Sequence, residues 1–301
     1  MHYFQRGYFP NIMEKVLSAG GTGVHIFFFC SGFGLFMSYT KRKVGYLDFL
    51  KRRFLKIYIP YIIVIAIWLL LLECNTDPLK TFLAHAFLYK MFMPLYEETP
   101  SGVFWYISTL FQFYFLFVPL VKVKEIIGNK KFLYISCFLS VVWWIFTAIT
   151  GLNSERVCGS FFLQYLWEFA IGIVIAERLI NGKDIKIKKY VLLLVGFVGL
   201  FLAGVLKMID GPATAVNDLF AACGYGSIAL LIYSLNLKYI NKIIIWISSI
   251  SYEWYLVHML VITILSQLFT DSFLALISIP ISLFIAWLYK RLIDVFQAIK
   301  I

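Results

Sequence analysis

Long uninterrupted apolar runs dominate this sequence and constrain its fold more than any other feature. An α-helix needs about 20 apolar residues to cross the roughly 30 Å of hydrocarbon in a bilayer. The runs here are continuous rather than alternating, which argues against a transmembrane β-barrel. We therefore predict an all-α fold, a polytopic transmembrane helical bundle with nine spans. The predicted spans lie at approximately 23–39, 57–72, 103–121, 133–150, 160–177, 190–207, 216–235, 244–270 and 272–289.

The composition supports this class of protein and excludes several others. The chain is 61% hydrophobic and only 14% charged, whereas soluble domains are close to half apolar and a quarter charged. The apolar content excludes a disordered chain, and the five scattered cysteines do not form a disulfide scaffold. We attribute the net charge of +11 to basic cytoplasmic loops rather than to nucleic-acid binding. Because no long linker or repeat is present, residues 1–301 are predicted to form a single transmembrane domain.

The charged residues of the loops predict an orientation. When the loops are assigned alternately to the two sides of the membrane, one set holds 21 of the 27 Lys and Arg residues. Cytoplasmic loops carry such an excess, so this set and the C-terminus are predicted to be cytoplasmic. Segment 79–96 is shorter than a span and is interrupted by His85, Lys90 and Pro94, so we predict that it is interfacial or re-entrant. The cytoplasmic set comprises 40–56, 122–132, 178–189, 236–243 and 290–301.

The same map places Met1 outside the membrane. Residues 1–22 lack the apolar region of a signal peptide. We therefore expect that a further helix precedes this sequence, which would give ten spans and bring both termini inside. The alternative is an N-out protein whose short, weakly charged tail crosses the membrane unaided.

Three ionisable side chains within predicted spans are candidates for an intramembrane polar site: Glu168, Glu253 and His258. An unpaired charge at the centre of a span costs about 2.5–3.5 kcal/mol, so the two carboxylates should face the bundle interior, beside His258, an arginine or a water-filled cavity. Glu253 and His258 are separated by about 140° around a helix, so a dyad between them is not expected. For His258 the alternative is an ordinary hydrogen bond to a neighbour. We expect smaller roles for His25 and His85, which lie near the outer face.

Several motifs follow one another in a fixed order along the chain. Their order and spacing resemble those of the acyltransferase 3 family of integral membrane acyltransferases, over essentially the whole sequence. The motifs are Gly23–Leu35 (GVHIFFFCSGFGL), Phe49–Pro60 (FLKRRFLKIYIP), Phe104–Tyr114 (FWYISTLFQFY), Phe169–Gly172 (FAIG) and Ile250–His258 (ISYEWYLVH).

This resemblance implies an enzyme of a bacterial cytoplasmic membrane. It would transfer an acyl group from acyl-coenzyme A to a hydroxyl of a cell-surface or exopolysaccharide glycan. The acyl group that we expect is acetyl. Its partners would be membrane lipid, acyl-coenzyme A and the surface or lipid-linked glycan that becomes O-acetylated during polysaccharide biosynthesis. We expect no bound cofactor, no metal and no nucleic-acid partner.

The resemblance also assigns a catalytic histidine. His2 is the best match to the family's general base, which sits on the family's first helix, ten residues after an arginine. That arginine would lie before Met1. In addition, Leu110 stands where many members have a glutamate, so this position supplies no carboxylate.

Two further groups of residues are candidates for binding acyl-coenzyme A. Arg52, Arg53 and Lys56 would hold its phosphates, because guanidinium groups match phosphate geometry. The alternative role for these residues is positive-inside anchoring, and Lys56 replaces a family arginine by a point charge. Ser31 and Gly32 would line a narrow channel for the pantetheine arm, or they would serve helix packing.

Two other functions remain open. A transporter or flippase of a glycan or lipid-linked precursor would use Glu168, Glu253 and His258 for proton coupling or substrate binding. A truncated family member would keep the bundle and lack activity. The sequence contains no GxSxG, Walker A or HExxH motif, so hydrolase, ATPase and zinc-protease functions have no support.

Overall fold

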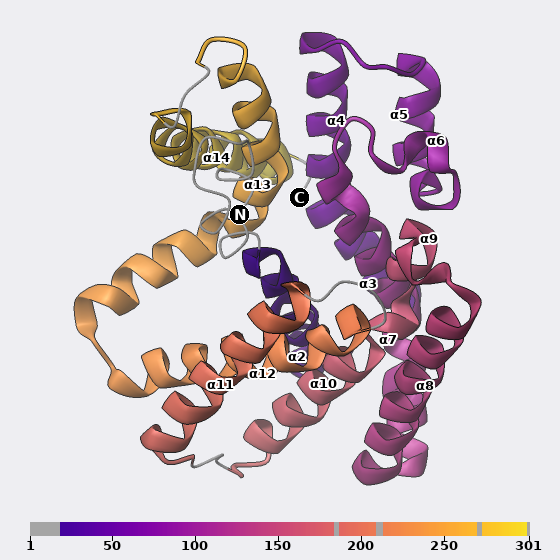
Figure 1. Cartoon of the computed structure of the whole chain (residues 1–301), viewed down its shortest axis with the longest axis vertical. Helices are drawn as coiled ribbons and strands as arrows, with labels where there is room; N and C mark the ends of the chain where they lie inside the picture. Colours follow the sequence, from indigo (N-terminus) through magenta and orange to yellow (C-terminus); the bar gives the residue numbers. More distant parts are fainter. Residues whose placement is uncertain (1–18, 184–186, 209–212, 270–272, 300–301) are drawn as a thin grey trace. The chain divides into compact units, whose positions relative to one another are not determined.

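The computed structural model describes residues 19–183, 187–208, 213–269 and 273–299, and this part of the chain is built from helices (Figure 1). The prediction of an all-α polytopic bundle is confirmed. Within these residues, eight helical segments are long and apolar enough to cross a membrane, and each overlaps one predicted span. They are Gly21–Lys41, Tyr46–Leu71, Gly102–Ile127, Asn129–Thr150, Lys189–Leu206, Asn217–Leu235, Lys238–Leu265 and Leu276–Ala298.

The helices group into two compact units. We name them the α10 unit, which includes residues 19–50 and 105–235, and the α13 unit, which includes residues 51–104 and 236–299. The single domain predicted for residues 1–301 stays a prediction. The α10 unit contains α2 (Val24–Lys41), α7 (Trp105–Ile127), α8 (Asn129–Thr150), α9 (Arg156–Gly159), α10 (Leu166–Ile180), α11 (Lys189–Met208) and α12 (Ala213–Leu235). The α13 unit contains α4 (Ile59–Leu71), α5 (Pro78–Ala86), α6 (Pro94–Glu97), α13 (Lys238–Leu265) and α14 (Phe273–Ile299).

The predicted span 160–177 is the one predicted span that does not correspond to a single long helix in the structure. Its helix, α10, has 15 residues and is therefore about 22 Å long, which is shorter than the hydrocarbon core. The residues before α10 form only short helical turns, and Gln112 of α7 is hydrogen-bonded to them. Its side-chain nitrogen donates to the Ser160 carbonyl at 3.0 Å, and its side-chain oxygen accepts from the Phe162 N–H at 3.0 Å.

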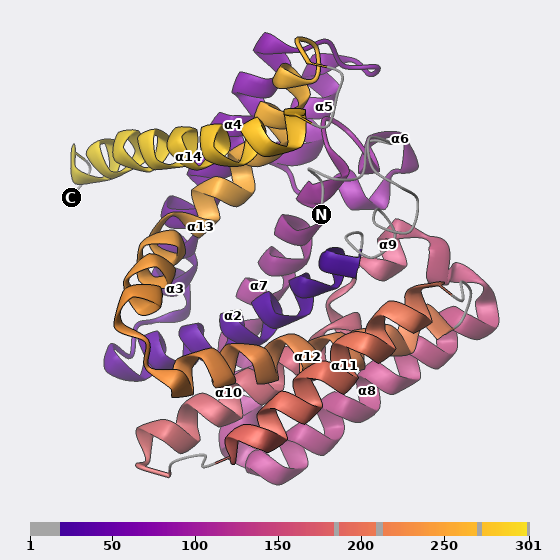
Figure 2. The same cartoon turned by 60° about the vertical axis from the view of Figure 1, so that its left-hand side comes forward.

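Glycines allow two pairs of helices in the α10 unit to pack with their backbones in contact. A Cβ atom on Gly32 of α2 would lie 2.2 Å from the Phe169 carbonyl oxygen of α10, and one on Gly172 would lie 2.2 Å from the Phe29 carbonyl oxygen. α11 and α12 run alongside each other (Figures 1 and 2), and a Cβ atom on Gly199 of α11 would lie 2.8 Å from the Gly224 Cα of α12. Small residues at such crossings are typical of packing between transmembrane helices.

α8 illustrates how an apolar run becomes an exposed helix. Gly128 precedes it with a φ of 78°, and Gly151 ends it with a φ of 70°, a backbone region that glycine enters without steric cost. Its outward side chains are large and apolar, including Phe138, 65% exposed, and Ile149, 81% exposed. A contiguous apolar surface of this kind requires a partner, and a lipid bilayer provides one.

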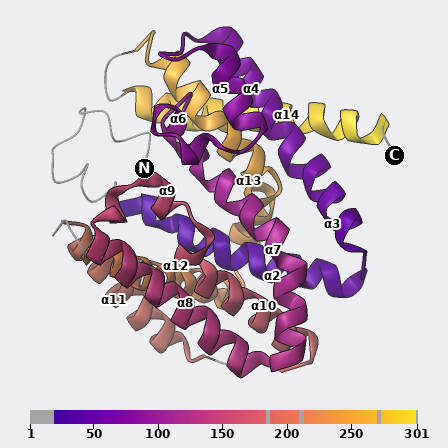
Figure 3. The same cartoon turned by 90° about the vertical axis from the view of Figure 1, so that its right-hand side faces the viewer.

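The last three residues of α3 (Tyr46–Arg53) belong to the α13 unit, and the helix continues through a π-helical turn, Phe54–Tyr58, into α4. α5 begins at Pro78, where the Asp77 side chain caps the Lys80 N–H at 2.9 Å, and it packs beside α4 (Figure 3). The helices within segment 79–96 are too short to cross a bilayer. The interfacial or re-entrant position predicted for this segment stays a prediction.

Candidate functional site

A buried histidine between two carboxylates is the main polar centre of the α10 unit. His25 lies in the first turn of α2, Glu168 in the first turn of α10 and Asp218 near the start of α12. The His25 Nδ1 is 2.8 Å from Glu168 Oε1, and its Nε2 is 2.9 Å from Asp218 Oδ1. His25 is 4% exposed and Glu168 is 1% exposed. Three helices that are distant in sequence therefore contribute one residue each to this centre. α2 lies beside both α10 and α12 (Figure 2).

The hydrogen bonds fix how many protons this centre holds. Either the imidazole is doubly protonated and donates to both carboxylates, or one carboxylate is protonated and donates to a neutral ring. Both arrangements contain two protons and carry a net charge of −1. The Gln164 side chain donates to the second oxygen of Asp218 at 2.7 Å. The second oxygen of Glu168, Oε2, is buried and has no hydrogen-bond partner among the described residues.

Aromatic rings enclose the same centre. Tyr165 packs on the His25 ring with a centroid distance of 5.6 Å. Phe28 and Trp105 stack on Tyr165 at 4.3 and 5.6 Å, and the Tyr165 hydroxyl donates to the Gly159 carbonyl at 2.9 Å. These rings exclude water, so the electrostatic interactions within the centre are stronger than they would be in solvent.

The centre corrects part of the sequence interpretation. Glu168 does face the interior, as expected, but its partner is His25 rather than His258. We gave His25 a small role and did not single out Asp218. A signal for Asp218 was present, because it lies within the predicted span 216–235 and a carboxylate at that depth requires a partner.

The two predicted pantetheine-channel residues have different surroundings. Gly32 is buried where α2 crosses α10, in direct backbone contact with Phe169, which matches the packing alternative. Ser31 is half-buried, and its hydroxyl lies 3.5 Å from the Tyr106 hydroxyl.

Arg52, Arg53 and Lys56 lie together at the π-helical turn of the α13 unit. Arg52 and Lys56 are exposed and Arg53 is half-buried. A π-helical turn disturbs the regular helical hydrogen bonds, and such turns are frequent at functional sites. The turn therefore displays a basic group of three side chains on an irregular backbone.

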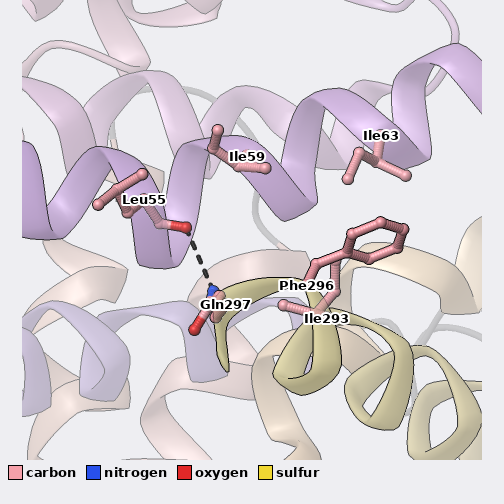
Figure 4. Close-up of a pocket in the computed structure, with 6 residues that line it drawn as sticks. All are labelled: Leu55, Ile59, Ile63, Ile293, Phe296 and Gln297. Atoms are coloured by element: carbon pink, nitrogen blue, oxygen red, sulfur yellow. Dashed lines mark hydrogen bonds between the residues drawn. The ribbon is translucent and has the colours of Figure 1, made fainter. Parts of the chain in front are cut away.

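Side chains from α13 and α14 bind the backbone carbonyls around this turn. Tyr252 donates to the Ile57 carbonyl and Tyr289 to the Pro60 carbonyl, each at 2.6 Å. Gln297 donates to the Leu55 carbonyl at 3.3 Å (Figure 4). These bonds tie the turn to α13 and α14, and the bond to the Pro60 carbonyl is buried, where an unsatisfied carbonyl is costly.

An apolar cavity of about 160 Å³ lies beside the turn. Leu55, Ile59 and Ile63 line one wall, and Ile293, Phe296 and Gln297 of α14 line the other (Figure 4). The basic side chains and the apolar cavity therefore occur on the same stretch of the α13 unit.

Glu253 and His258, both on α13, occupy separate environments. Glu253 is 8% exposed, and the positive charges that act on it are those of Lys290 and Lys56. The His258 Nδ1 lies 2.7 Å from the carbonyl oxygen of Tyr255, one turn earlier in the same helix. No dyad was expected between the two residues. The bond to Tyr255 matches the ordinary hydrogen bond considered for His258.

His85 lies at the centre of a buried cluster in the α13 unit. Its Nε2 donates to the Thr99 carbonyl at 2.8 Å, so Nδ1 is the acceptor for the Tyr61 hydroxyl. Lys90, also fully buried, donates to the Ser101 carbonyl at 3.2 Å. Burial, together with the nearby Lys90 charge, lowers the pKa of His85 to about 3, which keeps the ring neutral.

The predicted catalytic residue His2 lies outside the described residues. Among the described residues, no group of His, Cys, Asp and Glu side chains has the arrangement of a metal site.

Comparison with known proteins gives one match. The acyltransferase 3 family model, described as an acyltransferase domain, matches residues 1–291. No curated protein and no solved structure is significantly similar to the chain. The family match covers both units and agrees with the resemblance seen in the motifs.

Proposed function

Because this chain belongs to the acyltransferase 3 family of membrane acyltransferases, we propose that it transfers an acetyl group from acetyl-coenzyme A to a glycan hydroxyl. The family match carries this proposal, and the eight apolar helices found among the described residues indicate a multi-pass membrane protein. The acceptor in this proposal is a cell-surface, exopolysaccharide or lipid-linked glycan. The membrane is the bacterial cytoplasmic membrane, with the C-terminus in the cytoplasm.

The basic group at the π-helical turn supports coenzyme A as the donor. Arg52 and Lys56 reach solvent, where they can meet the pyrophosphate and the 3′-phosphate, and Arg53 adds a guanidinium group suited to bidentate contact. The predicted orientation puts this group on the cytoplasmic side, where coenzyme A is made. Positive-inside anchoring requires only charge near the membrane and not a particular side chain.

Two sequence assignments remain part of the proposal. His2 would deprotonate the acceptor hydroxyl, directly or through a relay of acyl carriers, because a histidine with an ordinary pKa near 6.5 suits this step at neutral pH. Ser31 and Gly32 would line the path of the pantetheine arm. The surroundings of Ser31 support this path better than those of Gly32, whose contact with α10 leaves no room for a ligand.

Labelled acetyl-coenzyme A supplied to membrane vesicles that contain the full chain tests the function. We expect label to appear on the glycan. A transporter or flippase would move the glycan or lipid-linked precursor across the vesicle membrane without label transfer, and that result would refute the enzyme.

Replacement of Arg53 by alanine tests the donor site. A hydrogen bond to a charged group contributes about 1.5–3 kcal/mol, so we expect Arg53→Ala to raise the KM for acetyl-coenzyme A by about tenfold to a hundredfold with a smaller change in kcat. The matched control is Lys131→Ala, an exposed basic residue of another predicted cytoplasmic loop. Equal effects of the two variants would indicate anchoring rather than phosphate binding.

A further inference from the structure

We propose that the apolar cavity between α4 and α14 binds the adenine ring of coenzyme A, while the basic group at the π-helical turn binds the phosphates of the same molecule. The inference rests on the proposed transfer from acetyl-coenzyme A. It gives a place to a part of the donor that takes no part in the chemistry. Every residue that it uses belongs to the α13 unit.

The size and lining of the cavity suit a flat ring. Its volume is about 160 Å³, and a cavity of about 150 Å³ lined by leucine, isoleucine and phenylalanine side chains binds benzene. Ile59 and Ile63 face Phe296 across the cavity (Figure 4), so a planar base would lie between aliphatic side chains and an aromatic ring. Phe296 is 61% exposed, so the cavity opens to the surface, which leaves room for the ring of the base that carries the sugar.

One polar side chain in the lining gives the cavity a preference among bases. The Gln297 side-chain nitrogen donates to the Leu55 carbonyl at 3.3 Å, and its side-chain oxygen is turned away from that carbonyl (Figure 4). The oxygen is therefore the acceptor that is left for a ligand. Glutamine recognises adenine through the N6 amino group and N7 of the base, whereas guanine has a carbonyl oxygen in place of that amino group.

The basic group lies where the phosphates of the same molecule would be. Residues three or four apart on a helix are neighbours on its surface, so Arg52 lies beside Leu55, and Lys56 lies beside Ile59. In coenzyme A, one ribose joins the adenine to both the 3′-phosphate and the pyrophosphate. A base in the cavity would therefore bring the phosphates to the cationic side chains, and this charge complementarity is what an apolar cavity alone does not provide.

The acyl chain of a membrane phospholipid is the competing occupant of the cavity. Leu55 lies in the predicted cytoplasmic segment 40–56, and the three lining residues of α14 lie in the predicted cytoplasmic segment 290–301. Most of the lining is therefore outside the predicted spans, at the level where a ribose and its phosphates can remain in water. A hydrocarbon chain would also have no group to pair with the Gln297 amide, so these observations favour the base.

Ile59→Trp tests the cavity, because the larger side chain fills the space and leaves the basic group unchanged. The matched control is Leu70→Trp on the same helix, since Leu70 is 84% exposed and does not line the cavity. The probe is adenosine 3′,5′-bisphosphate, which has the base, the ribose and two phosphates of coenzyme A but no thioester. Its Kd is measured with the purified full-length protein in detergent, together with the Tm of each variant.

We expect Ile59→Trp to raise the Kd for the probe by about tenfold or more, the loss expected for one stacked base, and Leu70→Trp to leave it unchanged within about twofold. The KM for acetyl-4′-phosphopantetheine, a donor without the base, should be the same in both variants as in the wild type. An unchanged Kd in Ile59→Trp would overturn the inference and assign the cavity to a lipid chain. A wild type that binds the probe but transfers no acetyl group would refute the proposed function and not the base site.

A second variant decides the matter if Ile59→Trp does not fold. Gln297→Leu keeps the approximate size of the side chain and removes its amide. We expect the wild type to bind adenosine 3′,5′-bisphosphate about tenfold more tightly than guanosine 3′,5′-bisphosphate, the range of one specific amide–base contact, and Gln297→Leu to lose this preference. Equal affinities of the wild type for the two bisphosphates would mean that only the phosphates are bound, and that result would overturn the inference.

Discussion

At the scale of single residues, the two buried histidines show how neighbours decide what one side-chain type can do. His25 lies between two carboxylates, so its ring nitrogens both participate in a proton-sharing network. His85 contacts a carbonyl and a tyrosine hydroxyl and lies near the charge of Lys90. His85 is therefore a neutral structural residue, whereas His25 belongs to a charged centre.

His85 predicts how stability depends on pH. The pKa of His85 is about 3 in the folded protein because of burial and the Lys90 charge, and about 6.5 in the unfolded chain. Below pH 6.5 only the unfolded state binds the proton, so the stabilising contribution is present above pH 6.5 and is lost as pH falls toward 3. We expect the Tm of the detergent-solubilised protein to fall less between pH 7 and pH 4 in His85→Gln than in the wild type. Parallel curves for the two proteins would contradict this account.

At the scale of helices, the crossing of α2 and α10 controls the geometry of the polar centre. Gly32 and Gly172 let the two backbones touch, and His25 and Glu168 are carried by these two helices. Any change that separates the helices must also lengthen the 2.8 Å contact between Nδ1 and Oε1. The packing of α2 against α10 therefore sets the distance between His25 and Glu168.

An alanine scan of two glycines on α2 tests the crossing. A Cβ on Gly32 would overlap the backbone of Phe169, whereas one on Gly34 would have nothing within 4 Å. We expect Gly32→Ala to destabilise the protein by about 1–3 kcal/mol and Gly34→Ala to be neutral or to stabilise it by up to about 1 kcal/mol, as read from Tm. If Gly32→Ala instead raised the KM for acetyl-coenzyme A without lowering the Tm, Gly32 would belong to the pantetheine path.

The helices show which elements a sequence can predict. Eight predicted spans correspond to apolar helices because bilayer thickness directly fixes the length of an apolar run. The helix predicted over 160–177 begins only at Leu166. The residues before it are hydrogen-bonded to Gln112, a residue about 50 positions earlier. Hydropathy within a window contains no information about such a distant contact.

At the scale of the whole molecule, the orientation in the membrane decides which substrate reaches which group. The loop charges predict that the loop after α8 is outside and the loop after α10 is inside. α10 must then cross the membrane although it has only 15 residues, with the short turns before it completing the distance. The orientation of the polar centre formed by His25, Glu168 and Asp218 depends on this crossing.

Two exposed asparagines provide a direct test of that crossing. Asn153 lies between α8 and α9, and Asn181 lies directly after α10. In a cysteine-free background, we expect Asn153→Cys to react with a membrane-impermeant maleimide in intact cells and Asn181→Cys to react only in inverted vesicles. Reaction of both variants from the same side would mean that α10 does not cross.

The site as a whole could be predicted only in part. The motifs identified the family, and charge within spans identified Glu168, because both signals are local in sequence. The partners of Glu168 could not be predicted, because His25 is 143 positions away and Asp218 lies on a third helix. Only folding brings these three side chains together, so a hydropathy map shows that a buried charge needs a partner without showing which partner it has.

The π-helical turn at Phe54–Tyr58 also has a consequence for comparing chains of this family. Each residue advances an α-helix by about 100°. Loss of one residue from this turn would therefore rotate Arg52 and Arg53 by about a quarter of a revolution relative to α4, while the apolar face of α4 kept its place against α14. A single-residue gap in an alignment at this point is thus more than a length variation. It marks chains whose basic side chains approach the donor from a different direction.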